Sequence, residues 1–475
     1  MDKLHTANRR YTLFVGIATF IVLGLLSIHF YKERVFFLDL SYILFKIIQQ
    51  NSLDIQINRF VSSFTQAFPY VGVQLNLPLS QIAKLYSISF VVFQFTTFLI
   101  LLKFLKHDFL ALGLLLLNTL IVTHIFYWTP SELIQGMAIL FLFLAVLDQL
   151  VSQPRPNYFF LKHISCMLLL VTVCFAHPLI IFPLVFAQLF MMSNYNSKIK
   201  TILFYLFSTV IIYYLKSILL SNDYDASHTK QIENLIDLFP DYATHSLTNF
   251  FGYLLKEYLF MTLLFLGLTL YYIWQKCFIK LLLIIGFFTF YTLLINVCFP
   301  KVEFQAYLES QYLPLSFFLI FPLVTEVLPK YANRRLTYLL LTILLISSIF
   351  RIYKAHTLYT ERVEWNRDLL AKCRLANKDK LILLDKELPK EVIFRSWALG
   401  FESWIQSTIE NSKTQSIVAV RNEKIFDNYL DKPNYFLVKW NTLPYHYLNS
   451  DYFILEDTMS TYQKIALDEL YSTTD

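Results

Sequence analysis

The chain has 475 residues, of which 56% are hydrophobic, 17% aromatic and 16% charged, with a formal net charge of +6. An ordinary soluble domain is about 45–50% apolar and about 25% charged. The composition therefore excludes a disordered, a collagen-like or a coiled-coil chain, and it argues against a single soluble globule. The small positive excess is typical of membrane-protein loops and indicates no nucleic-acid partner. We expect a polytopic membrane protein surrounded by the lipid bilayer.

Long apolar runs predict the membrane spans, because about 20 apolar residues are needed to cross a bilayer core. The first run, residues 11–30, follows Lys3, Arg9 and Arg10 and precedes further charged residues. This pattern predicts an uncleaved anchor and not a cleaved signal peptide. Ten further runs bring the predicted total to eleven: residues 84–102, 109–127, 132–149, 163–176, 178–193, 201–220, 250–273, 280–298, 312–328 and 336–352.

The Lys and Arg residues of the short loops predict the orientation. They are more frequent in the loops on the N-terminal side of the membrane, which places the N-terminus in the cytoplasm. The segments 31–83, 221–249 and 299–311 then lie outside, as does the tail. We expect a bacterial inner-membrane protein, for which the outside is the periplasm.

The chain divides into two predicted domains. Residues 1–352 form a transmembrane domain, and residues 353–475 form a more polar tail. The tail contains three strand-like runs, LILL, IVAV and YFLV, with helical stretches between them. This alternation predicts a small extracytoplasmic α/β domain.

The outer segment 31–83 predicts two amphipathic helices, over residues 35–50 and 57–68, at the membrane surface. Their polar stripes consist of Asp39, Lys46 and Gln50 in the first helix and of Arg59, Ser62, Ser63 and Gln66 in the second. Asp39 lies in the apolar run VFFLDL, where an unpaired carboxylate is costly. It is therefore either an interfacial residue paired with Arg34 or Lys46, or a residue with a chemical function.

This arrangement resembles the GT-C superfamily of integral-membrane glycosyltransferases. The stretch FFLDLSYI is similar to the acid-bearing first juxtamembrane helix of that family, and residues 58–90 resemble its second helix in uncharacterised bacterial members. The segment 307–323, YLESQYLPLSFFLIFPL, is similar to the start of a late span, although Gln311 stands where several members carry Arg. The resemblance implies an all-α membrane fold with two outer juxtamembrane helices. It also implies a sugar donor linked to polyprenyl phosphate.

Transfer of that sugar to a glycan, lipid or protein acceptor needs a base near the acceptor hydroxyl and a cation near the leaving phosphate. Asp39 is the expected general base. Arg59, and less favourably Lys46, is expected to stabilise the phosphate, because the fork of an arginine matches phosphate geometry. The other expected substrate-binding residues are Gln66, Glu132, His177, Glu309 and Tyr312.

Several of these residues have structural alternatives. Glu132 also suits a helix N-terminus by its charge, His177 also suits a hydrogen-bonded structural position, and Glu309 also suits the entry of a helix. Asp223 and Asp225 form a DxD pair, which makes them weak candidates for binding Mg²⁺ or Mn²⁺. The alternative for this pair is a solvated acidic loop, so no cofactor is assigned.

Two other classes of function remain open: a transporter or flippase of a lipid or glycan, and a non-catalytic membrane scaffold. Four residues distinguish them: Asp39, Arg59, Glu132 and Glu309. Convergence of these side chains on one outer cavity favours the transferase, whereas dispersal favours the scaffold. A path that reaches both faces of the membrane favours the transporter.

Overall fold

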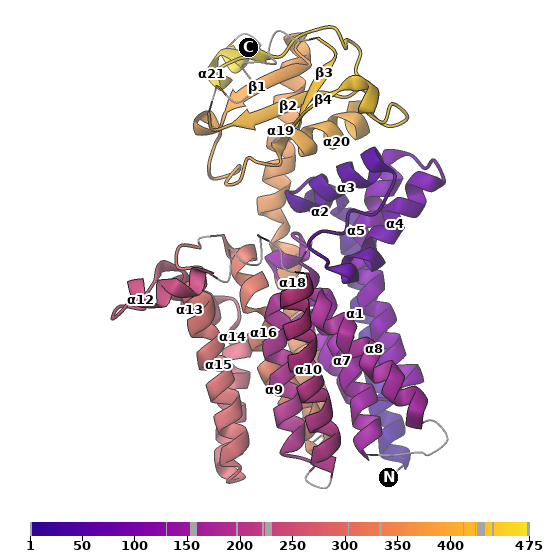
Figure 1. Ribbon diagram of the computed structural model, residues 1–475, viewed down its shortest axis with the longest axis vertical. Coiled ribbons are helices and arrows are strands. Elements are labelled where there is room, and N and C mark those ends of the chain that lie inside the picture. The colour runs from indigo at the N-terminus through magenta and orange to yellow at the C-terminus, as the bar shows by residue number, and fades with distance from the viewer. Residues whose placement is uncertain are drawn as a thin grey trace.

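The computed structural model describes residues 2–129, 131–152, 159–195, 198–220, 223, 230–302, 304–331, 335–411, 413–422, 424, 433–438 and 441–472. The molecule is long, with the N-terminus at one end of a helical body and a strand-containing C-terminal region at the other (Figure 1). We call the end that contains the strands the sheet end, and the end that contains the N-terminus the opposite end.

Helices make up most of the chain. The first half contains α1 (Asp2–His29), α2 (Tyr31–Val35), α3 (Asp39–Gln50), α4 (Ser63–Gln74), α5 (Leu79–Leu99), α6 (Asp108–Leu117), α7 (Glu132–Ser152), α8 (Phe159–Ala176), α9 (Ile181–Met192) and α10 (Ile199–Leu219). The second half contains α12 (Asn234–Asp237), α13 (His245–Lys256), α14 (Leu259–Trp274), α15 (Phe278–Cys298), α16 (Gln305–Pro322), α17 (Leu328–Tyr331), α18 (Arg335–Lys354), α19 (His356–Leu375), α20 (Leu399–Asn411) and α21 (Leu467–Ser472).

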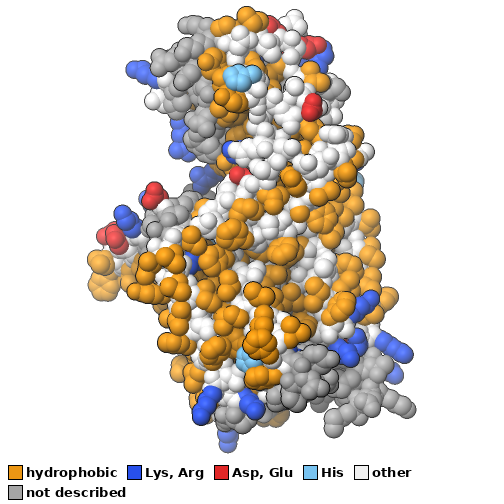
Figure 2. Space-filling model, turned by 45° about the vertical axis from the view of Figure 1, so that its right-hand side comes forward, with side chains coloured by type: hydrophobic (Ala, Val, Ile, Leu, Met, Phe, Trp, Pro, Cys, Tyr) orange, Lys and Arg blue, Asp and Glu red, His pale blue; other side chains and the backbone are white. Residues whose placement is uncertain are grey.

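Among the described residues, eight helical segments are long and apolar enough to cross a bilayer, or nine if the bent pair α13–α14 forms one span. The described residues therefore show eight or nine candidate spans where the sequence predicted eleven: run 250–273 is divided between α13 and α14, and α6 and the segment Pro178–Met192 are shorter than a full span. Hydrophobic side chains cover the helical body, and Lys and Arg gather at the opposite end (Figure 2). An apolar surface of this extent is typical of an integral membrane protein.

The predicted span 109–127 is helical only as far as Leu117. Asn118 and Thr119 donate side-chain hydrogen bonds to the carbonyls of Leu114 and Leu115, a local pattern that competes with a continuing helix. The following segment, residues 118–131, is here called the α6–α7 loop. Two of its carbonyls accept hydrogen bonds from a residue far away in the sequence: Arg351 Nη2 donates to Thr119 O and Leu120 O at 2.8 Å each.

The predicted span 250–273 also differs, because α13 and α14 meet at an angle of 88°. Helix α13 begins at a capped terminus, where the Thr244 hydroxyl accepts from the N–H of Leu247. At the bend, Arg351 Nη1 donates to the carbonyl of Glu257 at 2.7 Å. One arginine of α18 therefore holds both the bend and the α6–α7 loop.

The C-terminal region contains two small sheets. Strands β1 (Lys380–Leu384), β2 (Ser416–Val420) and β5 (Gln463–Lys464) form a parallel sheet in the order β2-β1-β5. Strands β3 (Tyr435–Val438) and β4 (Asn441–Pro444) form an antiparallel pair. The three predicted strand-like runs are thus strands, and α20 lies between β1 and β2 in the chain, as a parallel pair requires.

The two predicted amphipathic helices lie at the sheet end, beneath the C-terminal region (Figure 1). The first corresponds to α3, and the second is shifted toward the C-terminus, as a single turn at Phe60–Ser62 followed by α4. Lys32 of α2 forms an ion pair of 2.6 Å with Glu410 of α20. The outer segment is therefore attached to the C-terminal region.

Candidate functional site

A largely apolar cavity of about 520 Å³ lies between α9, α15 and the segment 231–237. Its apolar walls include Phe182, Leu235 and Phe290. Its polar residues are Arg59, which precedes the turn before α4, His177, which precedes α9, and Tyr307 and Gln311 of α16. We call it the Arg59 cavity. Its size and its small number of polar groups are typical of sites for small molecules.

Arg59 is held in place by Glu132, the first residue of α7. Arg59 Nη1 lies 3.2 Å from Glu132 Oε2, and the side chains are only 11% and 13% exposed. Glu132 therefore fits both expectations. Its charge lies at a helix N-terminus, and its side chain also contacts a residue that lines the cavity. Low exposure reduces the screening of the attraction between the two charges by solvent.

Asp39 does not line this cavity but is linked to it through Trp128 and Tyr307. Trp128 Nε1 donates a hydrogen bond of 2.8 Å to Asp39 Oδ2. The ring of Trp128 stacks on Tyr307, which lines the Arg59 cavity, at 5.8 Å between ring centroids. Burial raises the pKa of the Asp39 carboxyl, and the hydrogen bond from Trp128 opposes that shift. A carboxylate with a raised pKa is a stronger proton acceptor than an exposed one.

The start of α3 is positioned by α20. Leu38, which precedes Asp39, has a φ of 44°, and its N–H donates to Glu402 Oε1 at 2.9 Å. Glu402 also forms a buried ion pair of 3.0 Å with Arg362, in which both side chains are 1% exposed. Helix α20 therefore fixes the backbone from which the Asp39 side chain projects.

Glu309 positions the α6–α7 loop. Its Oε2 accepts from the N–H groups of Thr123 and Ile125 at 3.0 and 2.8 Å, and its Oε1 accepts from the Tyr258 hydroxyl. The residue is 2% exposed and does not line the Arg59 cavity. Because the loop carries Trp128, Glu309 acts on Asp39 indirectly.

The other predicted residues have separate surroundings. Gln66 accepts from the N–H of Asp54 at 2.8 Å and donates to its carbonyl at 2.9 Å, which fastens the connection between α3 and α4. Tyr312 is fully buried and stacks on Phe250 at 3.8 Å. His177 lines the Arg59 cavity, and its Nδ1 accepts from Leu179 at the start of a helical turn.

The structure thus brings Arg59 and His177 to one cavity. Glu132 is one contact away, through Arg59, and Asp39 is two contacts away, through Trp128 and Tyr307. Lys46 lies in a different pocket, beside the C-terminal region. The sequence analysis did not single out Trp128 or Glu402. The only signal for Trp128 was its place just before the predicted helix start at Glu132. Glu402 gives no local signal, because its partners are distant in the chain.

The predicted metal site is only partly covered by the structure. Asp223 is described, whereas Asp225 lies outside the described residues. Within the described ranges, no group of three or more His, Cys, Asp or Glu side chains is placed to hold a metal ion.

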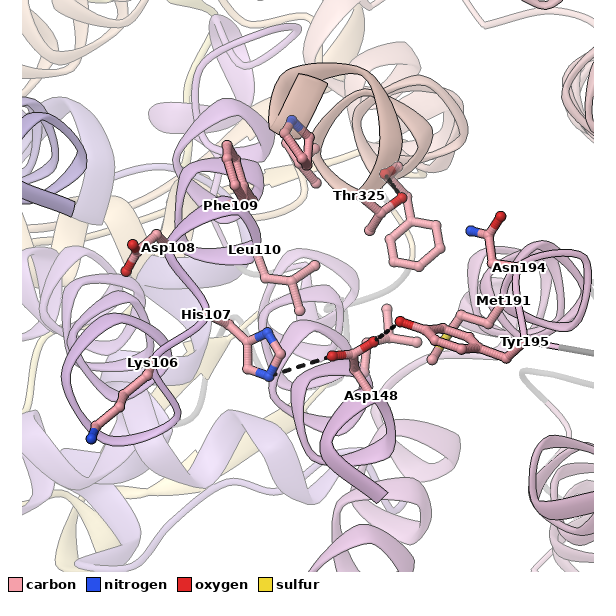
Figure 3. A pocket seen from close by; sticks show the side chains of 14 residues that line it. Lys106, His107, Asp108, Phe109, Leu110, Asp148, Met191, Asn194, Tyr195 and Thr325 are labelled. Atoms are coloured by element: carbon pink, nitrogen blue, oxygen red, sulfur yellow. Dashed lines mark hydrogen bonds and ion pairs between the residues drawn. The ribbon is translucent and has the colours of Figure 1, made fainter. Parts of the chain in front are cut away.

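A second cavity, of about 270 Å³, lies at the opposite end of the helical body. Here Tyr195 donates to Asp148 at 2.6 Å, and His107 Nε2 lies 3.8 Å from the same carboxylate (Figure 3). The three side chains point toward one another, while Lys106 points away (Figure 3). The described residues that line this cavity are all different from those that line the Arg59 cavity.

Comparison of the chain with models of protein families, with curated proteins and with solved structures finds no match. The function is therefore argued from the geometry of the site.

Proposed function

We propose that the protein is a membrane glycosyltransferase that moves a sugar from a polyprenyl-phosphate carrier to an acceptor. In this proposal the sheet end faces the periplasm, and the C-terminal region is an extracytoplasmic domain of the cell envelope. One observation carries the proposal: a single cavity joins an apolar wall to a largely buried cation, Arg59, and the acid Asp39 is linked to that cavity through Trp128 and Tyr307.

The Arg59 cavity suits a lipid carrier that bears a phosphate. Most of its lining is apolar, which matches an isoprenoid chain, and its polar residues are few. A guanidinium binds phosphate oxygens with two parallel N–H groups. Glu132 already holds the guanidinium of Arg59 in place, so less conformational entropy of this side chain is lost when the donor binds.

The chemical step uses Asp39 as the base. A hydroxyl of the acceptor gives its proton to the Asp39 carboxylate, and its oxygen forms a bond to the anomeric carbon of the sugar. The bond from that carbon to the phosphate oxygen breaks, and the electron pair leaves with the polyprenyl phosphate. Arg59 stabilises the negative charge that develops there. Trp128 holds the carboxylate in place through its hydrogen bond.

The test is turnover of labelled undecaprenyl-phosphate hexoses by the full-length protein in proteoliposomes. Wild type is expected to consume one of these donors, and Asp39→Asn is expected to lose the activity at normal protein level. Asp451→Asn is the matched control, because Asp451 is exposed in the C-terminal region. Equal turnover by wild type and Asp39→Asn would remove Asp39 from the mechanism. Movement of intact donor between leaflets without cleavage would favour the transporter.

A further inference from the structure

A smaller pocket of about 320 Å³ lies where α3 meets the C-terminal region. Helix α3 contributes Tyr42, Lys46 and Gln50, and α20 contributes Phe401. Tyr447, after β4, borders the other side. We call it the α3–α20 pocket. Its volume is at the lower end of the range for small-molecule sites.

The walls of this pocket combine aromatic faces with hydroxyl groups. The ring of Tyr42 meets the buried ring of Phe401 edge-on, at 5.1 Å between centroids. Tyr447 is 59% exposed. A sugar ring has an apolar C–H face and a rim of hydroxyls, so it can pack on such rings and hydrogen-bond to them at the same time.

The charge of the pocket favours an acidic ligand. Among the described residues that line the pocket, Lys46 is the one that carries a charge at neutral pH, and none of them is acidic. The side chain of Gln49 is already hydrogen-bonded within the protein. It accepts from the N–H of Asn449 at 3.1 Å and donates to the carbonyl of Tyr447. An anionic group is thus attracted by Lys46, and none of the described lining residues opposes it with a carboxylate.

The α3–α20 pocket and Asp39 share one helix. Tyr42 and Lys46 follow Asp39 by three and seven positions, which places all three near one face of α3. A helix rises 1.5 Å per residue, so Lys46 lies about 10 Å along the axis from Asp39. A saccharide chain that lies along α3 can therefore occupy the pocket and present a hydroxyl to Asp39.

We propose that the α3–α20 pocket binds the saccharide part of an acidic glycan acceptor. The aromatic rings hold the sugar faces, and Lys46 pairs with a carboxylate or phosphate of the glycan. The description of this glycan as an acceptor rests on the proposed transferase function, but its binding can be measured without any transfer.

The experiment measures binding of trigalacturonic acid and of maltotriose, as its neutral counterpart, to the full-length protein in nanodiscs by isothermal titration calorimetry. Wild type is expected to bind the acidic probe more tightly, and this preference is expected to weaken with added salt. Lys46→Met is expected to weaken binding of the acidic probe about tenfold. Binding of the neutral probe should be unchanged. Lys413→Met is the matched control, because Lys413 is 56% exposed and lies outside the pocket.

Tyr447→Ala provides a second variant at an exposed position, and it is expected to weaken binding of both probes. Wild type that binds neither probe, or an acidic-probe affinity that neither variant changes, would overturn the proposal. Asp39→Asn separates the two proposals, since it is expected to bind the acidic probe like wild type. If Asp39→Asn keeps full turnover while Lys46→Met no longer binds the acidic probe, Asp39 is not the base, and the binding proposal for the pocket is retained.

Discussion

The backbone N–H of Leu38 donates a hydrogen bond of 2.9 Å to Oε1 of Glu402, 364 positions further along the chain. Leu38 has a φ of 44° and a ψ of −118°, a backbone conformation that residues with a side chain rarely adopt and that costs about 1–3 kcal/mol. The next residue is Asp39. The C-terminal region therefore stabilises the strained backbone that directs the candidate base toward Trp128.

Glu402→Gln is expected to destabilise the protein by about 3–5 kcal/mol, because it leaves the buried charge of Arg362 without its partner. The measurement is thermal unfolding of the purified protein. Glu456→Gln, at an exposed ion pair, should unfold like wild type. The double variant Arg362→Leu with Glu402→Leu should recover stability but not turnover, since the N–H of Leu38 then lacks its acceptor. Full turnover in that variant would contradict the positioning role.

Trp128→Phe is expected to shift the acidic limb of the pH–rate profile to higher pH. Burial raises the pKa of Asp39, and the hydrogen bond from Trp128 lowers it. Without that bond the pKa rises further, and a base must lose its proton to act. The measurement is turnover as a function of pH. Trp274→Phe is the control, because Trp274 is 72% exposed on α14. An unchanged acidic limb in Trp128→Phe would argue against Asp39 as the base.

Arg59→Gln is expected to reduce turnover about 100-fold, the usual effect of removing one donor that stabilises charge in a transition state. Arg59→Lys should recover only part of this loss, because an ammonium lacks the two-pronged geometry of a guanidinium. The measurement is initial rate at saturating donor. Arg367→Gln, at a side chain that is 46% exposed, provides the comparison. Equal rates for Arg59→Lys and wild type would indicate that charge alone matters.

Glu309→Gln is expected to destabilise the protein by about 1–3 kcal/mol, because an amide cannot accept at both of the atoms that Glu309 uses. Thermal unfolding measures this effect. Tyr258→Phe removes one of the same hydrogen bonds and should cost less. The donor KM should change little in both variants, since Glu309 does not line the Arg59 cavity. A large rise in KM with normal stability would instead indicate direct contact with substrate.

The amino-acid sequence alone was enough to predict the class of protein and most elements. Long and short apolar runs are local patterns, so the helices α1, α5 and α7 and the strands β1, β2 and β3 lie close to where the sequence predicts them. The polar stripe of α3 was also predictable, because Asp39 and Lys46 differ by two helical turns.

Contacts between distant segments could not be predicted in this way. Hydropathy predicts one span over 109–127, but the helix ends at Leu117. Arg351, in α18, donates hydrogen bonds to the carbonyls of Thr119 and Leu120, which follow that end. The sequence likewise contains no sign that Glu309 binds the loop that carries Trp128. Local periodicity decides which residues are helical and which face is apolar. Hydrogen bonds across hundreds of positions depend on how the helices pack, and only the tertiary structure decides that.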